Sequence, residues 1–182
     1  MGYDWTPGLH FQDTRLLGDV YDTLGGLGQM EVPFIVRLFE NPKSAIALPG
    51  AINLFNHDCL HILLGRGLWN QDEAFIIGFS MGNDVAAKSW HRSMFKLISS
   101  KFYGRDERFI VTDLIAYDIG YEYGKECVMK NIHNTNFGLY MHKEISETRC
   151  LLGISEERLL ELRNRERLSI LSPSSDRLNS FV

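Results

Sequence analysis

The segment at residues 51–65, AINLFNHDCLHILLG, decides the fold class that we predict for this chain. Its apolar residues recur at the three- and four-residue intervals that give a helix one buried face, namely Ile52, Phe55, Leu60, Leu63 and Leu64. Pro49 and Gly50 precede the segment, and Gly65 and Gly67 close it, so helix-interrupting residues stand at both ends. We therefore predict one well-bounded helix here.

Helical spacing of apolar residues continues on both sides of this segment. The further helical stretches that we expect cover residues 16–24, 33–40, 71–82, 83–98, 106–127, 139–149 and 155–167. Glycine, proline and asparagine separate them, and we find no alternating pattern of a β-strand. The sequence predicts an irregular all-α bundle that forms a single domain over residues 1–171. The polar residues 172–182 predict a loose C-terminal tail.

Composition excludes several classes of function. The net charge is −4 and the pI is about 5.9, so the chain lacks the basic surface that nucleic-acid binding requires. Its three cysteines form no paired motif, which favours free thiols in a reducing compartment. The N-terminal sequence resembles neither a signal nor a transit peptide, and no apolar run approaches the roughly 18 residues that cross a bilayer. We expect a cytoplasmic protein whose membrane contact, if any, is peripheral; a homodimer is compatible with the sequence.

A metal-binding motif lies inside the first segment. His57, Asp58 and His61 lie within an arc of about 100° of one helix face, because each helical residue advances about 100°. Glu73 follows His61 after eleven residues, and the intervening glycines allow a turn into a second, antiparallel helix. The four side chains together predict a site for one divalent metal ion. Zinc is the first choice, and magnesium, manganese and iron also suit the donors.

Glu73 has a competing interpretation. Asn70 precedes it by three residues, which is the spacing of a capping box in which Glu73 would bond back to the Asn70 backbone. One carboxylate cannot serve fully as both helix cap and metal ligand. The two interpretations predict different orientations of the Glu73 side chain.

The pattern His57-Asp58-x-x-His61, eleven residues, Glu73 resembles the HDxxH-x11-E signature of the coenzyme Q (ubiquinone) biosynthesis protein 4 family. The resemblance implies an all-α protein in which His57, Asp58, His61 and Glu73 bind a metal beside a cavity for a polyprenylated quinone precursor. It also implies participation in removing the carboxyl carbon of the ring, oxidatively or otherwise. Partner proteins of the same biosynthetic complex and a membrane surface are implied as well.

Space for a prenyl chain is a further expectation. Gly78 with Gly82, and Gly120 with Gly124, form small-residue stripes that indicate either close helix packing or an apolar tunnel beside the metal. In the second interpretation the lipid-contacting residues are Phe75, Phe79, Gly78, Gly82, Gly120 and Gly124. Arg66 and Lys88 would meet an anionic headgroup, although each is also consistent with a solvated surface residue.

Two other functions remain open from the sequence. A non-catalytic scaffold would use the metal to hold a prenyl lipid for partner proteins. An HD-type metallophosphohydrolase would need a further histidine and aspartate, for which His10 and either Asp113 or Asp118 are candidates. That class leaves Glu73 unexplained.

Overall fold

The computed structural model describes residues 5–24, 48–101 and 108–170. Regular structure in these ranges is helical, apart from one isolated β-bridge between Leu16 and Glu144. The elements are α1 (Leu17–Asp22), α3 (Leu54–Leu64), α4 (Asn70–Asn83), α5 (Ser89–Lys101), α6 (Val111–Glu126), the short 3-10 turns η2 (Ile132–Asn134) and η3 (Phe137–Leu139), α7 (Ile145–Leu152) and α8 (Glu156–Ser169). The predicted all-α fold class is confirmed.

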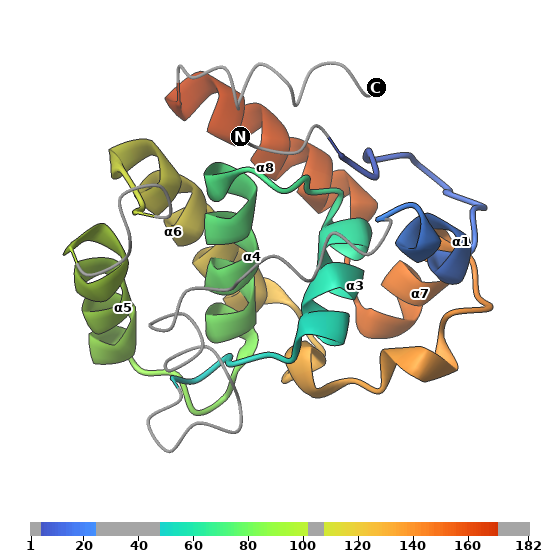
Figure 1. The fold of residues 1–182 in the computed structure, drawn as a ribbon, viewed down its shortest axis with the longest axis horizontal. Coiled ribbons are helices and arrows are strands. Elements are labelled where there is room, and N and C mark those ends of the chain that lie inside the picture. The colour runs from blue at the N-terminus through green and yellow to red at the C-terminus, as the bar shows by residue number, and fades with distance from the viewer. Residues whose placement is uncertain (1–4, 25–47, 102–107, 171–182) are drawn as a thin grey trace.

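Helices α4 and α6 pack against each other at the centre of the fold (Figure 1). Glycines allow their backbones to touch. A Cβ atom at Gly82 would lie 2.0 Å from the carbonyl oxygen of Tyr121, and one at Gly120 would lie 2.2 Å from that of Phe75. Gly78 and Gly124 make equally close approaches to the facing helix. Any larger residue at these positions would force the helices apart.

Helix α3 lies beside α4 (Figure 1); it ends at Gly65 as the sequence predicts, but it begins at Leu54, three residues into the predicted segment. The Asn53 side chain caps its start by accepting a hydrogen bond from the backbone N–H of Asn56 at 3.0 Å. Gly65 ends it in the left-handed conformation, with φ at 65°. The next N–H, that of Arg66, donates to the carbonyl oxygen of His61 at 2.8 Å. The end of α3 is therefore fixed by its own backbone.

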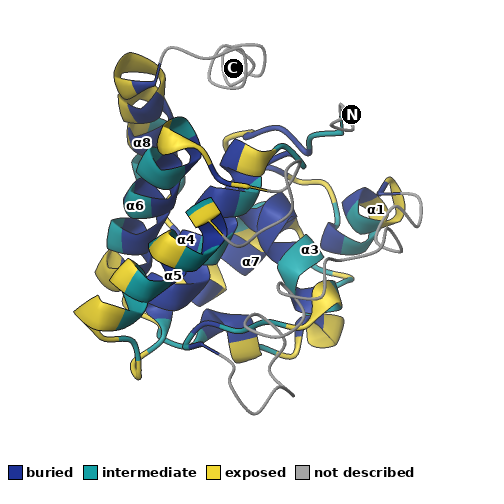
Figure 2. Cartoon of the chain, turned by 60° about the vertical axis from the view of Figure 1, so that its left-hand side comes forward, coloured by how far each residue is buried: buried dark blue, intermediate teal, exposed yellow. Residues whose placement is uncertain are grey.

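The outer helices shield this centre. Figure 2 shows buried residues concentrated in α3, α4 and α6, with exposed residues on the outer surfaces of α5 and α8. Arg92 of α5 reaches Asp118 and Glu122 of α6 at 2.9 and 2.8 Å. Lys96 reaches Asp118 at 2.7 Å. These pairs are about one-third exposed, so their contribution to stability is small.

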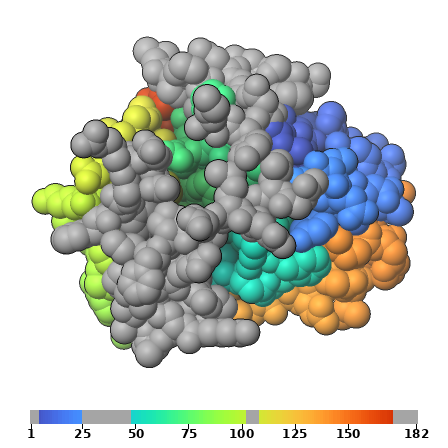
Figure 3. All heavy atoms as spheres, viewed as in Figure 1, coloured from blue at the N-terminus to red at the C-terminus, as the bar shows by residue number. Residues whose placement is uncertain are grey.

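The start of α1 packs against the segment that precedes α7 (Ile145–Leu152). The backbone N–H groups of Leu17 and Gly18 donate to the carbonyl oxygens of Lys143 and Met141 at 3.0 and 2.8 Å. Figure 3 shows the two segments in contact, blue against orange. One buried apolar cluster takes residues from α1, α3, α4, α6, α7 and α8, so these helices share a core.

Several predicted helix boundaries need correction. Of the stretch expected over 106–127, the described part starts at residue 108 and becomes helical at Val111, because Asp113 accepts a hydrogen bond from the backbone N–H of Ile110 at 2.9 Å and caps the helix there. The helix expected over 139–149 is instead α7, which begins at Ile145. The last helix begins as predicted, with Ser155 as its N-cap.

Other expectations fall outside the described residues. They are the helical stretch at 33–40 and the tail at 172–182. Among the helices that are described, none is both long and apolar enough to cross a membrane.

Candidate metal centre

Two histidines of α3 and a glutamate of α4 face one another. The Nε2 atom of His57 lies 3.2 Å from Oε2 of Glu73, and the Nε2 atom of His61 lies 3.3 Å from Oε1 of the same carboxylate. One potential ligand atom from each of the three residues lies within 4.8 Å of the others. The group can therefore hold a metal ion.

Local sequence places each of these side chains. His57 and His61 are one helical turn apart, so their rings stack edge to face with centroids 4.6 Å apart. Glu73 lies in the first turn of α4, which begins one residue earlier than predicted, with Trp69 as the N-cap. Asp72, not Glu73, bonds back to the cap: its Oδ2 accepts from the Trp69 N–H at 3.3 Å. Asp72 therefore serves the cap, and the Glu73 carboxylate faces the two histidines.

Burial distinguishes the three residues. The His61 side chain is 0% exposed, and neither of its ring nitrogens has a hydrogen-bond partner. Buried polar atoms are rarely left in this condition without a functional reason. The His57 and Glu73 side chains are 17% and 28% exposed, so the group is open to solvent on their side. An ion bound here would satisfy the Nε2 atom of His61.

Electrostatics couple the group tightly. Burial alone would lower the pKa of His57, but the charges of Glu73 and Asp58 and hydrogen bonds to both outweigh it and raise that pKa to about 10. Burial alone would raise the pKa of Glu73, but His61 and His57 hold it well below its usual range. Without metal the site is therefore an ion pair between a protonated His57 and an ionised Glu73.

Asp58, the fourth predicted ligand, lies at the edge of this group. Its Oδ1 is 3.8 Å from Nδ1 of His57, on the ring nitrogen that faces away from Glu73. It is not among the three residues whose ligand atoms converge. A carboxylate beside the outer nitrogen of a ligand histidine can orient its ring, so this position has a use even without direct coordination.

No protein-family model, curated protein or solved structure matches this chain.

The donor set is two imidazole nitrogens and one carboxylate. Donor sets of this kind bind divalent metals in proteins, and three protein ligands leave coordination positions for water or substrate. The chemistry that the site can perform follows from these donors and from its partial exposure.

The small-residue stripes form a close helix contact instead of a tunnel. Backbone atoms of the facing helix occupy the space beside Gly78, Gly82, Gly120 and Gly124. The predicted lipid contacts Phe75 and Phe79 are both 0% exposed and belong to the packed core. The lipid-binding expectation for these six residues needs correction, because the α4–α6 contact fills the space that it required.

Arg66 and Lys88 lie in different surroundings. Arg66 is 2% exposed, and its guanidinium lies 2.7 Å from Oε2 of Glu166 and 3.6 Å from the ring centre of Phe75. Arg66 is therefore not a solvated surface residue, and its role toward a headgroup stays a prediction. Lys88 is exposed in the turn before α5, and its proposed role stays a prediction.

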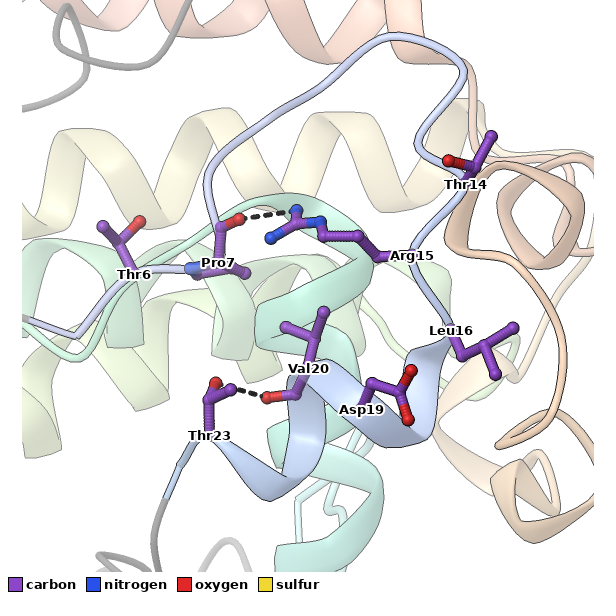
Figure 4. Close-up of a pocket in the computed structure, with 8 residues that line it drawn as sticks. All are labelled: Thr6, Pro7, Thr14, Arg15, Leu16, Asp19, Val20 and Thr23. Atoms are coloured by element: carbon purple, nitrogen blue, oxygen red, sulfur yellow. Dashed lines mark hydrogen bonds between the residues drawn. The ribbon is translucent and has the colours of Figure 1, made fainter.

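Surface hollows lie elsewhere in the described part of the chain. One of about 320 Å³ is formed by the N-terminal segment and α1 (Figure 4), and its lining residues are Thr6, Pro7, Thr14, Arg15, Leu16, Asp19, Val20 and Thr23. Arg15 is already engaged there, with Pro7 O at 2.8 Å and with Asp13. Another, of about 20 Å³ between residues 48–52 and α4, has room for about one water molecule. Neither is lined by the metal group.

The candidates for a phosphohydrolase site do not join the group either. Asp113 caps α6, and Asp118 is paired with Arg92 and Lys96. His10 is exposed on the N-terminal segment.

The sequence did not identify Asp72 as the capping residue of α4. Asp72 lies three residues after Trp69, and tryptophan is a poor N-cap residue, so the pattern gave little signal.

Proposed function

We propose that this protein binds one divalent metal ion through His57, His61 and Glu73, and that the bound ion acts on the ring of a prenylated quinone precursor. The observation that carries the metal site is the convergence of one potential ligand atom each from His57, His61 and Glu73 within 4.8 Å, with the His61 imidazole fully buried and making no hydrogen bond. A core histidine with no metal role would normally bond to a backbone or side-chain group.

Zinc is the metal that the donors favour. Two imidazoles and one carboxylate form the protein ligand set of several catalytic zinc sites, and the same set serves manganese and non-haem iron. Magnesium is less well suited, because it prefers oxygen ligands in an octahedron. The partial exposure of His57 and Glu73 would let water or substrate reach an ion held by these residues.

The substrate class is a hydroxybenzoate-like ring that carries a prenyl chain. A bound divalent ion supplies Lewis acidity to a phenol or carboxylate oxygen. Support for the quinone pathway comes from the HDxxH-x11-E pattern, which resembles the coenzyme Q biosynthesis protein 4 family. The proposal concerns the ring, because the packing of α4 on α6 fills the space first expected for the tail.

Metal content tests the site directly. Bound metal per chain is measured by elemental mass spectrometry after loading with zinc, manganese, iron or magnesium, for wild type and for His61→Ala, Glu73→Gln and Asp58→Asn. His142→Ala and Glu161→Gln serve as matched controls, because both residues are exposed and outside the group. We expect about one ion per chain in wild type and in both controls, and loss in His61→Ala and Glu73→Gln. Wild type that stays empty with all four metals would disprove the site.

Turnover then separates enzyme from scaffold. The loaded protein is incubated with a prenylated hydroxybenzoate, with and without dioxygen, and substrate and products are quantified by mass spectrometry. Loss of the ring carboxyl carbon in wild type but not in Glu73→Gln supports catalysis. Saturable binding without product supports the scaffold. If the protein neither binds nor converts the compound, the quinone precursor is ruled out as its substrate, and the metal site is unaffected.

A further inference from the structure

A buried charged cluster lies directly behind the metal centre. Arg66, in the turn between α3 and α4, pairs with Glu166 of α8, which is itself 0% exposed. The other carboxylate oxygen of Glu166 accepts a hydrogen bond from the side chain of Gln71 in the first turn of α4. Asp72 is also buried, with Oδ1 4.0 Å from the Arg66 guanidinium. One carboxylate of α8 thus contacts both the α3–α4 turn and the start of α4.

These contacts reach the metal ligands through short, rigid paths. The N–H of Arg66 donates to the carbonyl oxygen of His61 at 2.8 Å, so the Arg66 backbone is tied to one ligand residue. Gln71 precedes Glu73 by two residues in the same helical turn. Glu166 therefore has one connection toward His61 and one toward Glu73.

A second anchor on α8 strengthens the arrangement. Arg163 donates to the carbonyl oxygen of Gly65 at 2.6 Å, at the point where α3 ends. Its side chain is largely buried, and burial and the nearby charge of Arg66 lower its pKa to about 10. Two residues one helical turn apart on α8 therefore fix the end of α3 and the start of α4.

Burial makes this cluster specific. Charged groups removed from water tolerate few alternative arrangements, because an unpaired partner is costly. Arg66 is held further by the face of Phe75, which lies on α4 one turn after Gln71. The separation of the two ligand-bearing helix ends is thus held by the Arg66–Glu166 ion pair together with the hydrogen bonds of Gln71 and Arg163.

We propose that Glu166 is a positioning residue of the metal centre, acting through Arg66 and Gln71 to hold Glu73 opposite His57 and His61. The inference rests on the proposed metal function and adds α8 to the structure of the site. No contact of Glu166 with the ion is involved. Its effect is to fix the distance between the two ligand-bearing helices.

Cobalt(II) provides the test, because its visible absorption reports both affinity and ligand geometry. The dissociation constant and spectrum are measured for wild type, Glu166→Gln and Glu73→Gln. Glu166→Gln keeps the size of the side chain and removes its charge. We expect about 10-fold weaker cobalt binding and an altered spectrum for Glu166→Gln, which is the low end of the effect of losing a direct outer partner of a metal ligand, because Glu166 acts through Arg66 and Gln71.

Two controls separate positioning from general loss of stability. Glu161→Gln removes an exposed carboxylate from the same helix, and Leu152→Ala opens a cavity at the last residue of α7, in the core that α7 shares with α3 but outside the metal group. Both should bind cobalt within about twofold of wild type at a temperature where all variants are folded. In the Glu73→Gln background, adding Glu166→Gln should weaken the residual cobalt binding by less than it does in wild type, because the distance between the two helices matters little once α4 supplies no ligand.

The outcomes distinguish the two proposals. Unchanged cobalt affinity and spectrum in Glu166→Gln, with loss in Glu73→Gln, would refute positioning and leave the metal function intact. An equal loss in Leu152→Ala would also refute it, because affinity would then follow stability alone. Wild type that binds no cobalt would overturn both proposals.

Discussion

Asp72 and Glu73 are neighbours in the first turn of α4, yet their carboxylates serve different ends. Asp72 is 1% exposed and accepts a hydrogen bond from the Trp69 N–H, whereas Glu73 is 28% exposed at its side chain and faces His57 and His61. Adjacent helical residues point about 100° apart, so one can cap while the other binds. Because Asp72 caps the helix, the Glu73 carboxylate can face the two histidines and bind a metal with them.

Metal affinity should depend strongly on pH. Because Glu73 and Asp58 outweigh the effect of burial and raise the pKa of His57 to about 10, its imidazole is protonated at neutral pH and must lose that proton to bind a metal. We expect zinc binding to tighten about tenfold per pH unit between about pH 6 and 8, with about one proton released. Chelator competition and calorimetry in buffers of different ionisation enthalpy measure these quantities. A pH-independent affinity would contradict the ion pair in the empty site.

Stability of the metal-free protein should fall at high pH. The raised pKa of His57 contributes stability that is complete below its unfolded value, about 6.5, and is lost as pH rises through about 10. The lowered pKa of Glu73 contributes stability above its ordinary value and loses it in acid. Urea unfolding with chelator should therefore show wild type losing on the order of 2 kcal/mol more than Glu73→Gln between pH 6 and 9. Parallel pH curves for the two proteins would rule out this coupling.

Gly82→Ala should destabilise the central helix pair. The added methyl group would lie 2.0 Å from the Tyr121 carbonyl oxygen, which is backbone and cannot move aside alone. We expect a loss of about 2 to 3 kcal/mol in chemical denaturation, despite the better helix propensity of alanine. Gly138→Ala is the matched control: Gly138 is exposed, and its new methyl group would meet only the Asn136 side chain, at 3.2 Å. Equal stability of the two variants would show that α4 and α6 do not touch as described.

Asn83→Ala should be as damaging as a cavity in the core. Asn83 is 0% exposed; its amide donates to the carbonyl oxygens of Gly124 and Met129 at 3.1 and 2.8 Å, and its oxygen accepts from the Ile132 N–H at 2.8 Å. Removing the side chain deletes three hydrogen bonds to the backbone, those to Gly124 and Ile132 being buried, for a loss of about 3 kcal/mol. Thermal and urea unfolding measure the loss, with the exposed Asn134→Ala as reference. Faster amide exchange at Ile132 should accompany it.

The sequence predicts the parts of the site that depend on near neighbours. The two histidines lie one turn apart on a helix ended by Gly65, as the spacing indicates. Glu73 meets them because the turn is short. The start of α4 was predicted one residue late, because Asn70 is by type a better cap than Trp69 and nothing in the sequence shows that Asp72 is buried.

Contacts between distant residues explain what the sequence could not predict. Arginine is a residue type usually found at the surface. The burial of Arg66 is explained by its ion pair with Glu166, which lies 100 positions later in the sequence. The spacing of Gly78 and Gly82 identifies a special helix face, but whether that face borders a space or a backbone depends on how closely α6 approaches. The distance between two packed helices leaves no signal in the sequence of either helix.

The glycine contact between α4 and α6 also restricts how this protein can move. Gly78 and Gly82 are four residues apart on α4, as Gly120 and Gly124 are on α6. Each glycine lies against the backbone of the opposite helix, so the two helices interlock. Sliding by a fraction of a turn would drive side chains into the opposing backbone, which excludes the small shear displacements that packed helices often undergo. Glu73 stands at the start of one of these helices. A conformational change on binding would have to carry the pair as one body, with the other helices moving around it.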